Sequence, residues 1–142
     1  MNKSEIHDFI RRNPMLQLAT VDTEGHPRTR TVMLHAIEDG SILFHTGNFK
    51  TLYRELKENP RIEFSSYNAE SFTEIRVSGL AEEIDDDQLR EKVISAPGKE
   101  YLKPTIALKG KNAIRIFRIT DCKALVWTMA SNHDYPKTRV SV

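Results

Sequence analysis

Two turn sequences close to each other constrain the fold of this chain most strongly. Asp-Thr-Glu-Gly at residues 22–25 and Glu-Asp-Gly at residues 38–40 are rich in residues that favour tight turns. Three segments around them, residues 15–21, 27–37 and 41–45, have the apolar and β-branched character of strands. Because short turns of this kind join neighbouring antiparallel strands, the sequence predicts a three-stranded meander.

The remainder of the chain predicts further short strands with helices between them. A first helix over residues 5–12 has Ser4 as its N-cap and ends before Pro14. A second helix begins at Lys50 and stops at the Asn-Pro pair of residues 59–60. The other predicted elements are strands at 61–67, 71–84, 113–119 and 123–128, a helix capped by Asp85, Asp86 and Asp87, and one short helix with a mobile loop within 97–111.

Six or seven short antiparallel strands with helices at the turns predict a mainly β fold. Since closure removes the exposed edges of a sheet, we expect a closed or nearly closed barrel with peripheral helices. Gly79 indicates a bulge or a close approach of backbone within one strand. The length of 142 residues fits one domain over residues 1–142. Side chains fill a barrel of this size, so a cofactor would lie outside it, in a groove that a second subunit could complete.

Charge and cysteine content exclude several classes of protein. The chain has 21 Lys and Arg residues against 20 Asp and Glu residues, so no overall charge attracts it to nucleic acid or anionic membranes. No uncharged run is long enough for a spanning helix, and the amino terminus lacks the apolar stretch of a signal peptide. The single cysteine, Cys122, excludes a disulfide framework and fits a reducing compartment. We therefore expect a cytoplasmic protein.

An anion-binding pattern lies in the second strand and at the start of the second helix. The Arg-Thr-Arg-Thr segment at residues 28–31 alternates along a strand, which places its two arginines on one face. Thr46 and Lys50 follow in the next turn and helix start, and together with Arg30 they suit a phosphate monoester. Taken singly, an arginine on a strand or a lysine at a helix start is more often a solvated surface residue.

Three longer segments carry a resemblance to a known family. They are LATVDTEGHPRTRTVML at residues 18–34, ILFHTGNFKTLYRELKENPRIEF at 42–64 and EIRVSGLAEEI at 74–84. In this order the segments resemble the pyridoxamine 5'-phosphate oxidase-like flavin proteins, and the short chain with its ENPR segment looks most like their small general stress protein branch. The resemblance implies an antiparallel Greek-key split barrel of FMN-binding type, a homodimer, and FMN as the cofactor.

The resemblance also implies which residues contact the cofactor. Arg30 and Lys50 match phosphate ligands, whereas Val32 to Leu34 match the strand whose backbone borders the isoalloxazine ring. Trp127 would reach the flavin across the dimer interface. The implied FMN-binding residues are Arg30, Thr31, Val32, Met33, Leu34, His45, Thr46, Lys50, Glu74, Trp127 and Arg139. The protein needs no nucleophile of its own, because FMN carries the hydride or electrons.

His35 and His45 allow a second interpretation of the same region. A tight turn between their strands would bring them together as a metal or haem pair. A third ligand is missing, and neither an HExxH motif nor a cysteine cluster accompanies them. Solvent exposure or contact with flavin is therefore the better interpretation, and we expect no metal site.

The sequence leaves the activity of the protein open. Pyridoxamine phosphate oxidases have an Arg-x-His-type motif near the carboxyl end, which the tail YPKTRVSV at residues 135–142 lacks. One hypothesis is an FMN-dependent oxidoreductase that acts on an unknown small molecule, such as a quinone or nitro compound, with NAD(P)H as a candidate donor. The alternatives are a non-catalytic flavin-binding or sensing stress protein, and a module that binds a phosphorylated ligand without redox chemistry.

Overall fold

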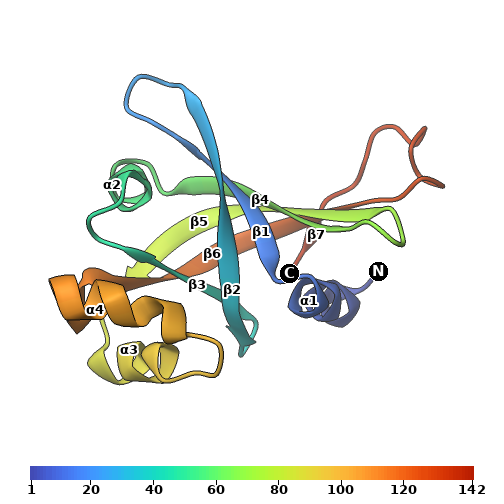
Figure 1. Ribbon diagram of the computed structural model, residues 1–142. Helices are drawn as coiled ribbons and strands as arrows, with labels where there is room; N and C mark the ends of the chain where they lie inside the picture. Colours follow the sequence, from blue (N-terminus) through green and yellow to red (C-terminus); the bar gives the residue numbers. More distant parts are fainter.

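The computed structural model describes all residues 1–142, and its central feature is a seven-stranded antiparallel sheet. The strands follow the order β3-β2-β1-β4-β5-β6-β7, and an added pairing of β3 with β6 closes six of them into a barrel (Figure 1). The bounds of the strands are β1 Met15–Val21, β2 Pro27–Glu38, β3 Ser41–Gly47, β4 Arg61–Asn68, β5 Thr73–Ile84, β6 Ile114–Trp127 and β7 Val140–Ser141. Because β4 lies beside β1, the first four strands form a Greek key. The predicted mainly β barrel is confirmed.

The two predicted turns form the hairpins of the β1–β2–β3 meander. In the first, the Asp22 carboxylate accepts hydrogen bonds from the backbone N–H groups of Glu24 and His26, both at 2.9 Å. In the second, Asp39 and Gly40 have φ values of 49° and 79°. Gly and Asp adopt left-handed backbone of this kind more readily than most residues, so the turn chemistry sets both reversals of the chain.

The first helix, α1 (Lys3–Arg12), packs against the barrel through Ile6, which is fully buried. Its N-cap is Asn2, and the predicted cap at Ser4 was wrong. The Asn2 side chain accepts from the Glu5 backbone N–H at 2.9 Å, and the Glu5 carboxylate accepts from the Asn2 backbone N–H at 2.7 Å. Because this reciprocal capping box satisfies two N–H groups at once, the helix starts earlier than the sequence predicted.

One long strand, β6, replaces the two strands predicted at residues 113–119 and 123–128. The polar residues between them suggested a turn, but Asp121 has a φ of 52° inside a continuous strand. The pairing of β5 with β6 shifts register at this point, and the resulting bulge lets both halves of β6 follow β5. Gly79 lies opposite the bulge, where a methyl group would come within 2.7 Å of the backbone carbonyl oxygen of Thr120 and 2.6 Å of Cγ2 of Ile119. The predicted close approach of backbone at Gly79 is confirmed.

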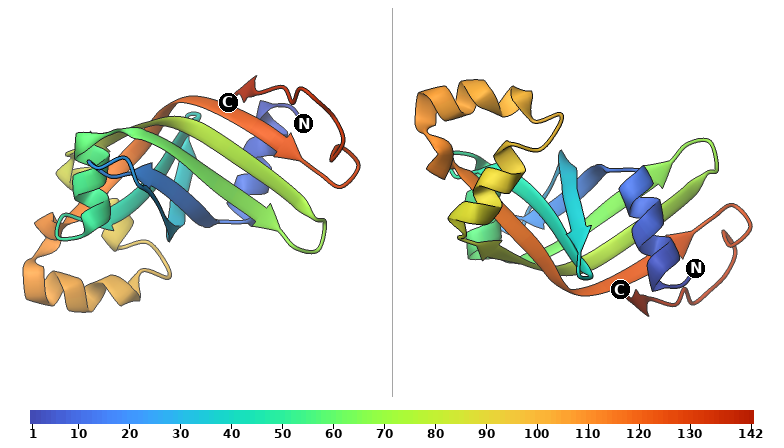
Figure 2. Two further views of the ribbon diagram at one scale, coloured as in Figure 1. Left: turned by 90° about the horizontal axis from the view of Figure 1, so that it is seen from above. Right: turned by 90° about the horizontal axis from the view of Figure 1, so that it is seen from below.

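Three further helices lie outside the barrel. They are α2 (Thr51–Glu58), α3 (Asp87–Ile94) and α4 (Lys103–Lys109), with 3-10 turns at Glu100–Leu102 and Lys111–Ala113. Figure 2 shows α3 and α4 together on one side of the barrel, away from α1 and the two chain termini. The short helix predicted within residues 97–111 is α4. Every helix of the chain is too short or too polar to cross a bilayer.

Strands β2 and β3 separate at one end of the barrel. They pair from Glu38 and Ser41 up to Leu34 and Phe44. Beyond this point β2 continues along β1, whereas β3 continues along β6. The barrel wall is therefore split here, and residues 30–33 of β2 border the opening on one side.

Candidate functional site

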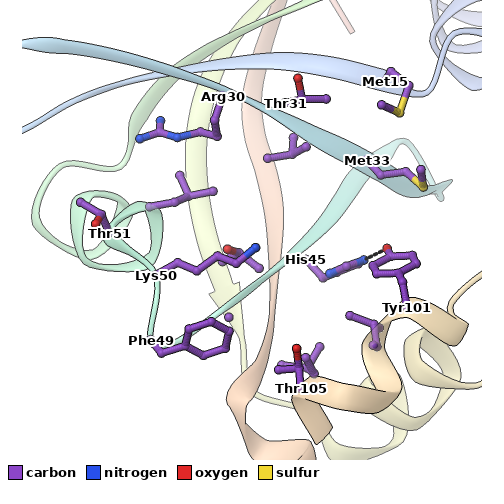
Figure 3. Close-up of a pocket in the computed structure, with 16 residues that line it drawn as sticks. Met15, Arg30, Thr31, Met33, His45, Phe49, Lys50, Thr51, Tyr101 and Thr105 are labelled. Carbon is purple, nitrogen blue, oxygen red and sulfur yellow. Dashed lines mark hydrogen bonds between the residues drawn. The ribbon is translucent and has the colours of Figure 1, made fainter. Parts of the chain in front are cut away.

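A cavity of about 690 Å³ occupies the opening between β2 and β3 (Figure 3). The end of β3, the start of α2 and the segment around α4 form its other walls. Seven of the residues predicted to bind a cofactor line it: Arg30, Thr31, Val32, Met33, His45, Thr46 and Lys50. The cavity lies where β2 and β3 diverge in the barrel wall.

No acidic side chain lines the cavity. Its charged lining residues are Arg30 and Lys50, and threonines supply hydroxyl groups. The larger apolar side chains of the lining, besides those of β2, are Met15, Phe49, Leu52, Leu102 and Ile114. A cavity with cations, hydroxyls and apolar surface but no carboxylate suits a ligand that combines an anionic group with a flat apolar part.

Arg30 is held by a partly buried hydrogen-bond network that joins β2 to β1 and α2. Its Nη2 donates to Oε2 of Glu55 at 2.6 Å, and its Nη1 donates to Oγ1 of Thr20 at 2.5 Å. Thr20 in turn donates to the same Glu55 oxygen at 2.6 Å, and Glu55 is only 4% exposed. Figure 3 shows the guanidinium turned toward α2. Since a guanidinium has five N–H donors, Arg30 keeps donors for a ligand after these contacts.

Lys50 lies directly before α2, and its side chain extends toward the middle of the cavity (Figure 3). No side chain caps this end of α2, and no acidic residue lies in its first turn. The free N–H groups and the dipole of a helix start favour an anion there. Thr46, which is buried, and Thr51 add hydroxyl groups to the same lining. This end of the cavity therefore has the groups that a phosphate requires.

His45 on β3 contacts two side chains from the segment that precedes α4. Its Nε2 lies 3.0 Å from the Tyr101 hydroxyl and 3.4 Å from the Lys99 ammonium. Burial, together with the nearby positive groups Lys99, His35 and Lys50, lowers the pKa of His45 to about 4. The His45 imidazole is therefore neutral at pH 7.

His35 and His45 have no third candidate metal ligand beside them. A bulge between Leu34 and Ala36 places His35 near the end of the β2–β3 pairing, and burial lowers the pKa of its imidazole. No group of three or more His, Cys, Asp or Glu side chains in the chain could hold a metal ion. The pair therefore lacks a third ligand in three dimensions as well as in the sequence.

The apolar wall of the cavity comes from β2 and its neighbour β1. Met33 is 40% exposed at the mouth, directly opposite Met15 of β1, which is 56% exposed. Val32 is buried in the barrel core and also reaches the cavity. The Leu34 side chain packs in the core and does not line the cavity, because β2 is already paired with β3 at that position.

Glu74, Trp127 and Arg139 lie away from the cavity of their own chain. Tyr67, Glu74 and Trp127 are directly opposite one another on β4, β5 and β6, so they form one row across the sheet. Arg139 forms an ion pair with Glu63 at 3.4 Å. A single chain therefore does not bring these three predicted residues to the seven that line the cavity.

Sequence reasoning missed Glu55, Lys99 and Tyr101. The position of Glu55, one turn after Leu52 on the apolar face of α2, was a signal that this carboxylate is buried. Lys99 and Tyr101 come from an irregular segment with no hydrophobic period, so the sequence offers no signal for where they lie.

A family model described as Pyridoxamine 5'-phosphate oxidase matches residues 3–125. A pyridoxine/pyridoxamine 5'-phosphate oxidase of Deinococcus deserti is 31% identical over 93 residues, which are 66% of this chain and 44% of that protein. A dihydrophenazinedicarboxylate synthase of Pseudomonas chlororaphis is 35% identical over 88 residues, which are 62% of this chain and 40% of that protein. The chain thus matches less than half the length of these curated relatives.

Several solved structures resemble nearly the whole chain. A NimC/NimA family protein of Clostridium acetobutylicum has a TM-score of 0.73 at 16% identity and covers 99% of this chain and 92% of its own. A protein related to general stress protein 26, from the same organism, has a TM-score of 0.76 at 14% identity, with coverage of 100% and 97%. A pyridoxamine 5'-phosphate oxidase-related, FMN-binding protein of Nostoc punctiforme has a TM-score of 0.65 at 16% identity, with coverage of 96% and 86%. At these identities the likeness concerns the fold.

Proposed function

The chain belongs to the pyridoxamine 5'-phosphate oxidase family, and from this premise we propose that its cavity binds FMN. The observation that carries the proposal is the convergence of Arg30, Thr46 and Lys50 on one cavity that has no lining carboxylate. A phosphate monoester carries nearly two negative charges, which a guanidinium, an ammonium and a hydroxyl group neutralise well. The same cavity offers an apolar wall to a flat ring.

The two parts of FMN bind at different residues in this proposal. Arg30, Thr46 and Lys50 hold the phosphate together with the start of α2. Residues 31–33 and His45 lie along the ring system. The cavity volume of about 690 Å³ is within the range of cofactor pockets, so the residues present fit the group in both charge and size.

We infer that the protein is an oxidoreductase acting on a small molecule. Bound FMN supplies hydride or electron transfer. The side chains of the chain bind and orient the ligand, and none of them is required as a nucleophile. The test is the colour of the purified protein: absorbance at about 450 nm that NAD(P)H bleaches supports an enzyme.

A flavin-binding stress protein with little turnover is the alternative, in keeping with the small general stress protein branch. It is favoured by the match in length with the structure related to general stress protein 26, which covers 100% of this chain. Flavin colour that NAD(P)H does not bleach supports this alternative. A colourless protein that takes up no FMN contradicts both forms of the proposal.

We also infer a homodimer, because one chain leaves the cavity incomplete. Met15 and Met33 are exposed at the mouth, while Glu74, Trp127 and Arg139 lie on a different surface of the same chain. A second copy can cover the mouth and bring such residues to it. Sedimentation of the flavin-bound protein should give the mass of two chains, and a mass of one chain with flavin bound would contradict the dimer.

The sharpest test of FMN binding removes its phosphate ligands. Arg30→Ala and Lys50→Ala should each weaken FMN binding by about 1.5 to 3 kcal/mol, because each removes a charge-assisted contact. Arg28→Ala is the matched control, since Arg28 lies on the same strand but pairs with Asp22 at 3.2 Å in the hairpin turn. Fluorescence titration gives the affinities, and unchanged affinity in both Arg30→Ala and Lys50→Ala overturns the proposed site.

A further inference from the structure

Three side chains that the phosphate site does not use meet beside the cavity. His45 lines the cavity, and its Nε2 lies 3.0 Å from the Tyr101 hydroxyl and 3.4 Å from the Lys99 ammonium. The imidazole and the Tyr101 ring are stacked, with centroids 6.2 Å apart (Figure 3). Lys99 is only 7% exposed, and its single hydrogen-bonding contact from the side chain is the one to His45.

The chemistry of these contacts determines where the His45 proton lies. An ammonium group has three donors and no acceptor, so Lys99 can bond to Nε2 only if that nitrogen carries a lone pair. The Tyr101 hydroxyl can donate to the same lone pair. The imidazole is neutral at pH 7, because burial, together with Lys99, His35 and Lys50, lowers its pKa to about 4. A neutral imidazole with a free Nε2 carries its one proton on Nδ1.

We propose that Lys99 and Tyr101 fix His45 as its Nδ1–H tautomer, which makes this N–H a donor to the polar edge of a heteroaromatic ring bound in the cavity. This ring is that of FMN, so the claim that His45 donates to a bound ligand rests on the proposed function. Nδ1 of His45 has no hydrogen-bond partner within the chain, and it is not among the buried polar atoms. His45 is then the contact residue, and Lys99 and Tyr101 are positioning residues.

This arrangement selects among ligands. An unconstrained imidazole exchanges its proton between the two nitrogens, so it can face a ligand as a donor or as an acceptor. When Lys99 fixes its tautomer, His45 can only donate a hydrogen bond into the cavity. A ligand with a carbonyl oxygen or an unprotonated ring nitrogen at that place accepts this bond and therefore binds more tightly. A ring with an N–H at the same place leaves two donors facing each other, which costs affinity.

The tautomer is tested by two-bond ¹H–¹⁵N correlation spectra of the full-length protein at pH 7, with the His45 signals assigned from His45→Gln. The wild-type protein should show Nδ1 protonated and Nε2 bare. Lys99→Met should gain the Nε2–H form and raise the pKa of His45, because it removes the obligatory donor and its charge. Lys103→Met, an exposed lysine of the same segment, is the control and should leave both unchanged. A wild-type His45 with its proton on Nε2, or an unaltered tautomer in Lys99→Met, overturns the inference.

The affinities for FMN and riboflavin test whether the His45 N–H binds the ring of the ligand. Lys99→Met should weaken the binding of FMN and of riboflavin by a similar factor, roughly three- to tenfold. The contact that is lost is the one between His45 and the ring system, which the two ligands share. Lys50→Ala should weaken FMN alone, because riboflavin has no phosphate. Equal affinity of Lys99→Met and wild type for both probes, or a loss confined to FMN, overturns the role of His45. If the wild-type protein binds neither probe, the proposed function fails, whereas the spectra still decide the tautomer.

Discussion

At one end of the cavity the Arg30 guanidinium is paired with the buried Glu55 carboxylate at 2.6 Å. At the other end the buried Lys99 ammonium has no carboxylate partner, and its one side-chain hydrogen bond is to the neutral imidazole of His45 at 3.4 Å. We refer to Arg30, Glu55 and Thr20 as the Arg30 end, and to Lys99, His45 and Tyr101 as the Lys99 end. Each end carries one cationic side chain, and Arg30 is 25% exposed whereas Lys99 is 7% exposed. They differ in whether the chain itself supplies the countercharge.

Because of this difference, one end of the cavity mainly positions hydrogen-bond donors and the other mainly attracts an anionic ligand. Glu55 and Thr20 fix the direction of the Arg30 donors before any ligand arrives, although they also neutralise part of its charge. The positive potential of the cavity therefore depends more on Lys50 and Lys99, which have no carboxylate beside them. The Arg30 end contributes geometry and stability, and the Lys99 end retains its charge at a cost in desolvation.

The largest effect is expected for a substitution of Glu55. Glu55→Ala should lower the free energy of unfolding by about 3 to 5 kcal/mol, because it removes a buried carboxylate and leaves the partly buried Arg30 guanidinium and the Thr20 hydroxyl without their common acceptor. Urea denaturation measures the loss. Glu58→Ala, an exposed position on the same helix, is the control and should change the unfolding free energy by about 0.5 kcal/mol or less. Similar losses in the two variants would show that the Arg30 pair does not stabilise the fold.

A second, smaller effect is the contribution of the Lys99 end to the pH dependence of the free energy of unfolding. His45 binds a proton near pH 6.5 when unfolded but only near pH 4 when folded, because its folded pKa is about 4. The unfolded state thus binds more protons between these values, so the free energy of unfolding falls as the pH drops from about 6.5 to 4 and levels off below. The shift corresponds to a loss of about 3 kcal/mol.

The measurement compares wild type with His45→Gln in urea at a series of pH values from 7 to 4. His7 and His35 are present in both proteins, and burial lowers their pKa values as well, so they cancel in the difference. The wild-type curve should be steeper by the contribution of His45. Parallel curves would mean that the folded protein accommodates a charged His45 imidazole. The two ends would then differ less in how they accommodate charge than their contacts indicate.

Of the Arg30 end, Arg30 itself could be predicted from the sequence together with the neighbouring Thr46 and Lys50, because these residues belong to regular elements close together in the chain. Strand alternation places Arg30 and Val32 on one face, and the turn between β2 and β3 returns Thr46 and Lys50 to their side. The position of Glu55 follows from helical spacing on α2, although a buried carboxylate could be recognised only with Arg30 in place.

The Lys99 end could not be predicted in this way. Lys99 and Tyr101 lie in a 3-10 turn and its approach, where neither the period of a helix nor that of a strand applies. Their placement depends on tertiary packing, in which Leu102 is buried beside them. The same limit explains β6: a local bulge at Asp121 keeps one strand continuous where the polar residues resemble a turn.

The smallest effect, and the most direct contrast with Glu55→Ala, is expected for Lys99→Met. Removing an ammonium that has no counterion also removes its desolvation cost, so this variant should be as stable as wild type or more stable by up to about 1 kcal/mol. Burial lowers the pKa of Lys99, so the unfolded state binds more protons at alkaline pH, and wild-type stability rises as the pH climbs toward 10.5. The advantage of Lys99→Met at pH 7 should therefore shrink at pH 10 in paired urea titrations. A loss of stability comparable with that of Glu55→Ala would instead mean that Lys99, like Arg30, is held by an interaction that the fold depends on.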